Sequence, residues 1–311
     1  MTCRRKSVRL IVVIPVGPGT NMEFVRDTIN SVVCYTRESR RIVVVDNTGA
    51  NACADLSDEY PDVDVVATPE VFGVNAELYL TGSRGYLHAL ARFDFDVLLR
   101  MDVDALIIGG GAEEEAYRLF SEDPSIGALG SYRVDCNMHP RDWKKVGEQV
   151  KLEARLAPLT WHSKAYGAYL LRRYFYKGNR GVWSYRRILA NAIGNGYMLG
   201  EHFMGGAVFF SGECIRRLHE AGLLFRTDLR WSRLADDQLV SLLIRSIGMR
   251  IVDFCPDPMP MGLRWRGLPD SPENLVARGK KVIHSTKFWK DMNEKQIRKI
   301  FREQRALNHF Q

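Results

Sequence analysis

The feature that most limits the fold is a regular alternation of strand-like and helix-like segments over the first 132 residues. Apolar runs rich in β-branched residues cover Leu10–Val16, Arg41–Val45, Val63–Ala67, Asp96–Met101 and Ile126–Tyr132. Segments with helical periodicity separate them, at Met22–Tyr35, Ala52–Tyr60, Ala76–Arg92 and Glu113–Phe120. Continuous apolar runs are typical of strands that are buried on both faces. The alternation therefore predicts an α/β fold whose mostly parallel sheet is flanked by helices and joined by right-handed crossovers.

The pattern loosens in residues 133–204, which are rich in aromatic residues and arginine and which we predict to be a helical insertion. Its aromatic residues could stack on a ligand or lie at a membrane interface, but for most of them we favour packing within the insertion. They are Trp161, Tyr166, Tyr169, Trp183 and Tyr185. A regular pattern then returns with a strand in AVFFSG, helices at Glu213–Ala221 and Asp236–Ile247, and a strand at Met249–Phe254. We interpret Gly262 to Lys281 as a loop of lid length, and the chain from Lys287 onward as a charged helical tail.

Composition excludes few classes of protein. The 311 residues carry a formal net charge of +7, which favours anionic partners without choosing among them. Six scattered cysteines without a CxxC spacing argue against a zinc ribbon and indicate reduced thiols. The apolar run after the basic N-terminal residues stops at Pro15, too early for a signal-peptide core or a membrane span. We therefore expect a cytoplasmic protein that touches a membrane at most peripherally.

Two carboxylates follow the strand-like run Val97–Met101 directly. Asp102 and Asp104 are separated by one residue, so on an extended segment both side chains project to the same side. Burying two like charges beside a core strand is costly unless something positive neutralises them, and a divalent cation such as Mg²⁺ or Mn²⁺ suits carboxylate oxygens. Ligands of open α/β sheets collect at the carboxyl ends of strands. The pattern thus favours a metal and phosphate site, against the alternative of two loop-capping or surface acids.

The order of these motifs resembles that of the GT-A-fold glycosyltransferases, especially family 2. The motifs are IVVIPVG, IVVVDNTG, the GSRG helix, the DVD segment, GGAVFFSGECIRRLHEAG and ADDQLVSLLIRSIGMRI. The resemblance runs from Leu10 to about Phe254, with a gap over the insertion. It implies a single GT-A-like (Rossmann-related) domain over residues 1–311. Residues 8–132 would be its nucleotide-sugar-binding half, 133–204 the insertion, and 205–311 the acceptor half with a lid and tail.

The resemblance assigns the nucleotide pocket to residues that follow the first three strands. Pro15, Val16 and Gly17 would line the pocket. Asp46 would accept a hydrogen bond from the base or ribose, although a turn-forming Asx residue is an equal alternative. Arg84 of GSRG would hold a pyrophosphate or base oxygen, with a solvated arginine on a helix face as the alternative.

The resemblance also assigns the metal and diphosphate site. Asp104 would coordinate Mn²⁺ or Mg²⁺ directly, while Asp102 would contact the ribose or a water on the metal, and Val103 lies between them. His284 would complete the metal site, because neutral imidazole is a good ligand for Mn²⁺. Lys287 would meet the diphosphate. The alternative for His284 is a lone surface histidine.

The pair Asp236-Asp237 resembles the Glu-Asp dipeptide at a helix start in the family, although Ala235 stands where glutamate is usual. In inverting enzymes of the family this aspartate is the general base, which here is Asp237, with Asp236 close behind. Acids in a first helical turn also offset the helix dipole, which is the competing interpretation. Gly205 and Gly206 would let the backbone approach the sugar or acceptor closely, unless they only form a β-bulge.

These assignments predict a metal-dependent, hexosyltransferase-like enzyme that moves a sugar from a nucleoside-diphosphate sugar to an acceptor hydroxyl. The donor would be a UDP-sugar, the acceptor a glycan, lipid or small molecule, and the reaction inverting. A retaining enzyme of the same fold is the nearest alternative. A sugar nucleotidyltransferase is more distant, because the first strand lacks the arginine of a GGxGxR loop. A basic surface-binding protein would leave the two carboxylates unexplained, and nucleic acid is not an expected partner.

Overall fold

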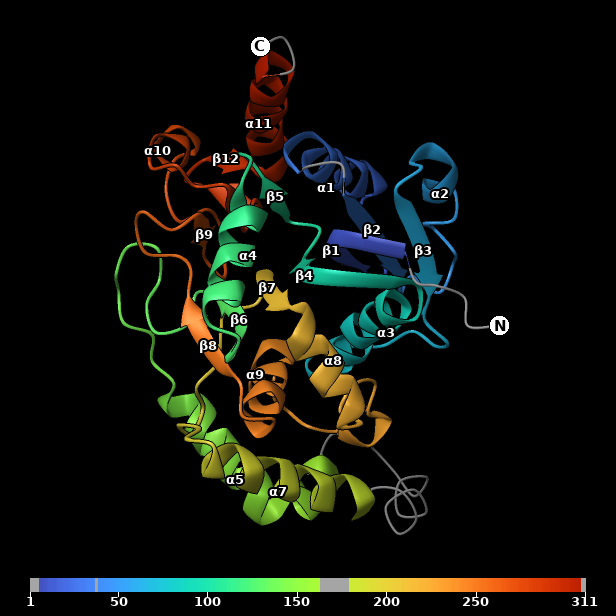
Figure 1. The fold of residues 1–311 in the computed structure, drawn as a ribbon, viewed down its shortest axis with the longest axis vertical. Helices are drawn as coiled ribbons and strands as arrows, with labels where there is room; N and C mark the ends of the chain where they lie inside the picture. Colours follow the sequence, from blue (N-terminus) through green and yellow to red (C-terminus); the bar gives the residue numbers. More distant parts are fainter. Residues whose placement is uncertain (1–5, 37–38, 163–178, 309–311) are drawn as a thin grey trace.

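A seven-stranded sheet forms the centre of the computed structural model, which describes residues 6–36, 39–162 and 179–308 (Figure 1). Its strands are β1 (Lys6–Val16), β2 (Arg40–Asp46), β3 (Val63–Ala67), β4 (Phe93–Met101), β6 (Ile126–Gly130), β7 (Ala207–Ser211) and β8 (Arg250–Asp253). They lie in the order β3-β2-β1-β4-β7-β6-β8. Neighbouring strands are parallel except for β7, which is antiparallel to both β4 and β6. The predicted mostly parallel sheet is confirmed.

Helices cover both faces of this sheet (Figure 1). One face carries α1 (Met22–Tyr35), α2 (Leu56–Glu59) and α4 (Ala112–Glu122), and the other carries α3 (Ala76–Arg92), α8 (Gly212–Glu220) and α9 (Asp236–Ser246). The apolar run of β1 serves both layers, since its alternate residues join different cores, Ile11 and Val13 on the α3 side and Val12 and Ile14 on the α1 side. The bounds predicted for α1, α3 and β3 are confirmed, whereas the helix predicted at Ala52–Tyr60 is reduced to the four residues of α2.

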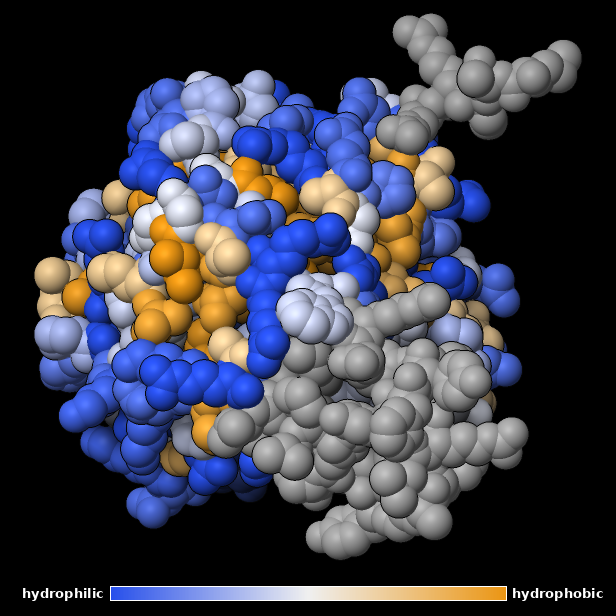
Figure 2. Space-filling model, turned by 90° about the horizontal axis from the view of Figure 1, so that it is seen from below, coloured by the Kyte–Doolittle hydropathy of each residue, from blue (hydrophilic) through white to orange (hydrophobic). Residues whose placement is uncertain are grey.

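Helices α5 (Lys144–His162) and α7 (Asn179–Gly194) lie beyond α9, at the bottom of Figure 1. Tyr185 on α7 is fully buried in the core that also contains residues of α9, whereas Trp183 is 64% exposed. Seen from this end of the molecule, the surface has hydrophobic patches between hydrophilic residues (Figure 2). The other aromatic side chains of the predicted insertion, Trp161, Tyr166 and Tyr169, lie outside the part that the structure describes. In the described ranges, no helix is both long and apolar enough for a membrane span.

A small second sheet, in the order β5-β10-β9, joins the C-terminal region to the centre of the molecule. The strand β5 (Ala105–Ile107) pairs there with elements of the C-terminal region, which are β9 (Met261–Leu263), α10 (Pro272–Ala277), β10 (Val282–His284), the hairpin β11 (Phe288–Trp289) and β12 (Met292–Asn293), and α11 (Glu294–Asn308). The 3-10 helix η2 (Thr227–Leu229) lies elsewhere, between α8 and α9 in the sequence and in contact with α7. The prediction of one long loop from Gly262 to Lys281 is wrong. Residues of this stretch form the end of β9 and the helix α10, because Leu263, Leu268 and Leu275 are fully buried.

Candidate active site

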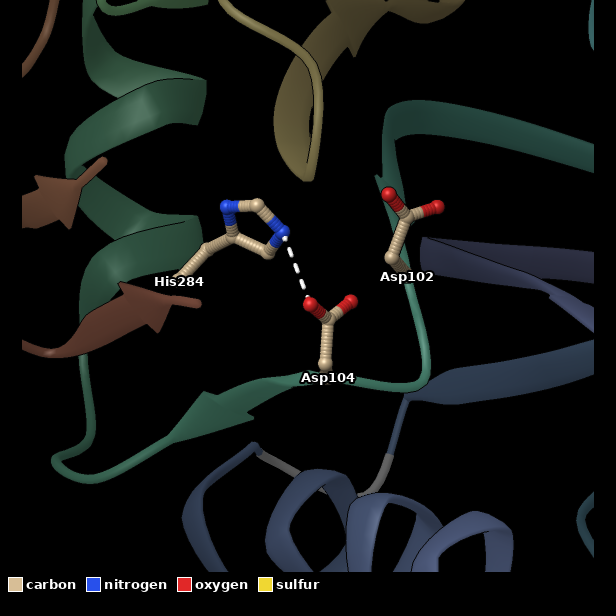
Figure 3. A group of neighbouring side chains, drawn as sticks. All are labelled: Asp102, Asp104 and His284. Atoms are coloured by element: carbon tan, nitrogen blue, oxygen red, sulfur yellow. Dashed lines mark ion pairs between the residues drawn. The ribbon is translucent and has the colours of Figure 1, made fainter. Parts of the chain in front are cut away.

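The ends of strands β4 and β10 bring three predicted metal ligands together (Figure 3). Asp102 and Asp104 form the turn between β4 and β5, and β10 pairs antiparallel with β5 so that His284 lies opposite Ala105. One ligand atom each of Asp102, Asp104 and His284 lies within 4.8 Å of the others. The Nε2 atom of His284 is 3.3 Å from Oδ2 of Asp104. Pairing over a long sequence separation thus assembles the group.

The chemistry of this group fits a divalent cation. Two carboxylates and one imidazole suit Mn²⁺, and the carboxylates also suit Mg²⁺. The Nδ1 atom of His284 lies 2.9 Å from the carbonyl oxygen of Arg264, so a proton on Nδ1 leaves the Nε2 lone pair facing the carboxylates. His284 is only 5% exposed, which contradicts the alternative of a lone surface histidine.

Positive and hydrogen-bonding groups surround Asp104. Ser285 Oγ donates to its Oδ2 at 2.8 Å, and Lys287 Nζ lies 3.3 Å from the same oxygen. Burial opposes ionisation of Asp104, but the contacts with His284, Ser285 and Lys287 outweigh it and hold its pKa below the usual value. The Lys287 side chain is 62% exposed, so it can also reach a group that enters from solvent.

A buried arginine that was not among the predicted site residues neutralises the other carboxylate. Arg100 on β4 places its guanidinium 2.9 Å from Asp102 Oδ1 and 3.0 Å from Asp236 Oδ2. The acid pair therefore does not depend on a divalent cation alone for its neutralisation. Burial raises the pKa of Asp102 and Arg100 opposes that rise. A charged residue inside the apolar run Val97–Met101 was the signal that could have revealed it.

The two acids at the start of α9 differ in their surroundings. Asp236 pairs with Arg100, whereas Asp237 Oδ2 accepts a hydrogen bond from the Gly205 amide at 2.9 Å. Oδ1 of Asp237 accepts from the amide of Gln238 in the first helical turn. Burial, with the neighbouring Asp236 charge, raises the pKa of Asp237 to about 7. Asp237 therefore accepts a hydrogen bond in the first turn of α9 and also has a pKa that suits uptake and release of a proton near neutral pH.

Gly206 lies at the junction of these groups. Its φ is +100°, and a Cβ atom there would lie 2.3 Å from Nδ1 of His284. Its carbonyl oxygen accepts a hydrogen bond of 2.7 Å from the Asp102 amide. A residue with a side chain at this position would push against the imidazole, so glycine is required for the close approach.

A cavity of about 500 Å³ opens beside the metal-ligand group. Its lining comes from the end of β1 and the segment that follows it, from α1, from the turn after β4 and from the C-terminal region. The lining residues are Pro15, Gly19, Thr20, Asn21, Phe24, Asp102, Val103, Asp104, Lys287 and Glu294. Of the three pocket residues predicted at the end of the first strand, Pro15 lines the cavity, whereas Val16 is fully buried and Gly17 accepts hydrogen bonds from Thr20.

Asp46 and Arg84 do not belong to the described lining of this cavity. Asp46 is buried at the end of β2, where its carboxylate accepts hydrogen bonds from the amides of Thr48 at 2.9 Å and Cys53 at 3.0 Å. Burial opposes its charge, but these contacts lower its pKa. Arg84 is exposed on α3 and donates to the carbonyl of Ala67. The contacts of Asp46 agree with the alternative of a turn-forming Asx residue, and the position of Arg84 agrees with the alternative of a solvated arginine on a helix face.

No protein-family model matches the chain, and no curated protein sequence matches it. Solved structures that resemble it include a mannosyltransferase from Pyrobaculum calidifontis in complex with GDP-Man and Mn²⁺, at 18% identity, TM-score 0.45, and coverage of 80% of this chain and 55% of that chain. Another is the bifunctional glycosyltransferase WbbM, at 13% identity, TM-score 0.47, and coverage of 96% and 50%. Residues 1–349 of S. aureus TarS with UDP-GlcNAc match at 14% identity, TM-score 0.33, and coverage of 43% and 37%. The chain thus spans about half or less of each of these three structures.

Proposed function

We propose that this chain is a metal-dependent glycosyltransferase that uses a nucleoside-diphosphate sugar. The observation that carries the proposal is the group Asp102, Asp104 and His284, which lies at the end of a central strand beside an open cavity of about 500 Å³. A divalent cation held by carboxylates usually keeps positions for substrate phosphates. The exposed amine of Lys287 at the same cavity supplies a second cationic group for a diphosphate.

The proposed chemistry at the donor is stabilisation of the leaving group. Asp102, Asp104 and His284 would hold Mn²⁺ or Mg²⁺, which when bound neutralises charge on a diphosphate. Lys287 would add electrostatic stabilisation as negative charge develops on the departing phosphate. Asn21, Phe24 and Glu294, which sequence reasoning missed, would contribute to the donor pocket together with Pro15 and Val103.

The proposed chemistry at the acceptor is proton removal by Asp237, with inversion at the anomeric carbon. A base works best when its pKa lies near the working pH, and burial places that of Asp237 at about 7. Asp236 is the poorer base because its carboxylate pairs with Arg100. A retaining reaction is the second candidate, since the same carboxylates do not fix the stereochemistry.

The finer identity of the substrates is also part of the proposal. We infer a UDP-sugar as donor, in line with the family resemblance, and a glycan, lipid or small-molecule hydroxyl as acceptor. A cytoplasmic location, with at most peripheral membrane contact, accords with the reduced cysteines.

The test is a turnover assay on the full chain with UDP-, GDP-, CDP- and ADP-sugars, in Mn²⁺ or in EDTA. We expect release of one nucleoside diphosphate that depends on the metal and falls by orders of magnitude in Asp237→Asn. We also expect NMR to show that the anomeric configuration of the product is inverted relative to the donor. Retention would replace the inverting mechanism by the retaining one. Release of pyrophosphate from a sugar phosphate and a nucleoside triphosphate would indicate a nucleotidyltransferase, and salt-sensitive surface binding without turnover would overturn the enzyme assignment.

A further inference from the structure

A fully buried arginine from the last helix reaches the turn that carries the metal ligands. Arg298 on α11 has a side chain that is 1% exposed. Its Nη2 donates to the carbonyl oxygen of Val103, the residue between Asp102 and Asp104. The contact joins two segments 195 residues apart in the sequence. The described helix α11 is thereby attached to the peptide that presents both carboxylates.

The same guanidinium contacts other parts of the cavity wall. Its Nε donates to Glu294 Oε1 at 2.9 Å, and its Cζ lies 4.7 Å from the centroid of the Phe24 ring. Phe24, Val103 and Glu294 all line the cavity. Arg298 therefore lies behind three lining residues that come from three separate segments of the chain.

A buried carboxylate fixes Arg298 in this position. Nη1 of Arg298 donates to Asp27 Oδ2 at 2.9 Å, and the Asp27 side chain is only 3% exposed. Arg305, further along α11, donates to the other oxygen of Asp27. Burying these charges is tolerable only because each is paired and hydrogen-bonded. The planar guanidinium reaches Glu294, Asp27 and Val103 from three different nitrogens, whereas the three donors of a lysine share one nitrogen and cannot reach these separated positions together.

Other side chains hold the carbonyl groups of the same turn. Thr28 Oγ1 donates to the Val103 oxygen at 2.7 Å. The amide and Oγ1 of Thr286 donate to the Asp104 carbonyl oxygen at 2.9 Å and 3.0 Å. The carboxylates are thus presented by a turn whose backbone oxygens are fixed from α1 and from the C-terminal region.

We propose that Arg298 is a positioning residue that holds the Asp102–Asp104 turn in the conformation that binds a divalent cation. The inference rests on the proposed function, because it takes that cation as the ligand of the turn. Partners that orient metal ligands typically contribute about 10- to 100-fold to metal affinity. Helix α11 is then a part of the metal site and not only a cover for the fold.

The experiment measures Mn²⁺ binding to the full-length chain by the loss of the free-Mn²⁺ EPR signal, together with thermal unfolding. Arg298→Lys keeps a positive charge beside Asp27 but loses the fork to Val103. We expect it to remain folded and to bind Mn²⁺ about 10- to 100-fold more weakly at a temperature well below its unfolding transition. Lys299→Met is the matched control, because Lys299 lies on the same helix with a side chain that is 76% exposed.

A second variant avoids the buried ion pair altogether. Thr28→Val removes the other hydrogen bond to the Val103 oxygen, together with a longer contact of 3.3 Å from Nη1 of Arg298, and keeps the ion pair between Arg298 and Asp27. Because both donors hold one oxygen, we expect the double variant to lose more Mn²⁺ affinity than the product of the two single losses. If the double variant loses only the product of the two single losses of Mn²⁺ affinity, Arg298 and Thr28 do not share a role at the Val103 carbonyl.

The outcomes separate this inference from the proposed function. If the wild-type chain binds no Mn²⁺, the proposed function fails and the inference fails with it. If wild type binds Mn²⁺ and the Arg298 variant binds it equally well with only a lower melting temperature, Arg298 is merely structural and the inference alone is overturned. The inference is likewise overturned if Lys299→Met weakens Mn²⁺ binding as much as Arg298→Lys does.

Discussion

Asp104 and Asp237, on the metal side and the acceptor side of the candidate active site, have surroundings that shift their pKa values in opposite directions. Around Asp104, an imidazole, a hydroxyl and an amine gather on one carboxylate and lower its pKa. Around Asp237, burial and the adjacent Asp236 raise the pKa of a carboxylate to about 7. Asp104 therefore keeps its negative charge, as a metal ligand needs, whereas Asp237 is ready to take up a proton. The comparison teaches that similar acids acquire different roles from their neighbours.

Arg100 and Gly206 connect the two sides. Arg100 pairs with Asp102 on the metal side and with Asp236 on the acceptor side. Gly206 contacts His284 closely and follows Gly205, whose amide donates to Asp237. A substitution on one side should therefore leave the function of the other side unchanged only if it preserves the contacts of Arg100 and Gly206.

The largest effect should come from Asp104→Asn, which removes charge from the metal side. We expect Mn²⁺ affinity to fall by more than about 100-fold, because a direct ligand should matter more than the partners that orient one. Sugar transfer should be lost with it. Calorimetric titration with Mn²⁺ measures the loss, and unchanged affinity would remove Asp104 from the metal site.

Asp237→Asn should affect only the acceptor side. An amide cannot accept the proton, so we expect kcat to fall by about 10²- to 10⁴-fold while Mn²⁺ and diphosphate affinities stay within a few-fold of wild type. Steady-state kinetics combined with calorimetry separates the two effects. Normal turnover would show that Asp237 is not the base.

The pH dependence should differ between the sides. If Asp237 is the base, kcat should rise as its carboxyl loses a proton near pH 7, and this rise should be absent in the residual activity of Asp237→Asn. The same group affects stability with the opposite sign. The folded chain keeps a proton that the unfolded chain releases near pH ~4, so this contribution to stability decreases between about pH 4 and 7. Thermal unfolding across this range, with Asp237→Asn as reference, checks the sign.

A pair of glycine variants sharpens the connection between the sides. In Gly206→Ala the new methyl group would lie against the His284 ring, so we expect a loss of Mn²⁺ affinity of about 10-fold or more. In Gly205→Ala the nearest atom is Asp237 Oδ2 at 3.5 Å, an ordinary contact, so Mn²⁺ affinity should be kept. Equal losses in the two variants would show that the close approach at Gly206 is not special.

The smallest effect on the site should come from Asp46→Asn. Its carboxylate organises the loop after β2 through Thr48 and Cys53, so we expect a melting temperature lower by a few degrees and nucleotide affinity close to that of wild type. A large loss of nucleotide affinity at unchanged melting temperature would restore Asp46 as a nucleotide contact.

The sequence predicted those parts of the molecule that local periodicity determines. The bounds of α1 and α3 follow from helical spacing and from end signals such as Asn21, whose side chain accepts from the Glu23 amide. Strand β5 and strand β10 have three residues each, too few to show a period, and pair across a long separation in the sequence. Asp102 and Asp104 were expected from their spacing at the end of a buried strand, and His284 from the family resemblance. The pairing that joins them, and the buried Arg100 and Arg298, depend on tertiary contacts that no local pattern reveals.

The most direct test of the central claim is calorimetric binding of UDP, GDP, CDP and ADP to the full chain, with Mn²⁺ and with chelator. We predict that one diphosphate, which we expect to be UDP, binds in the presence of Mn²⁺ and that the binding is lost with chelator. Equal binding with chelator would contradict the metal site. Absence of binding to all four diphosphates would contradict the glycosyltransferase assignment itself.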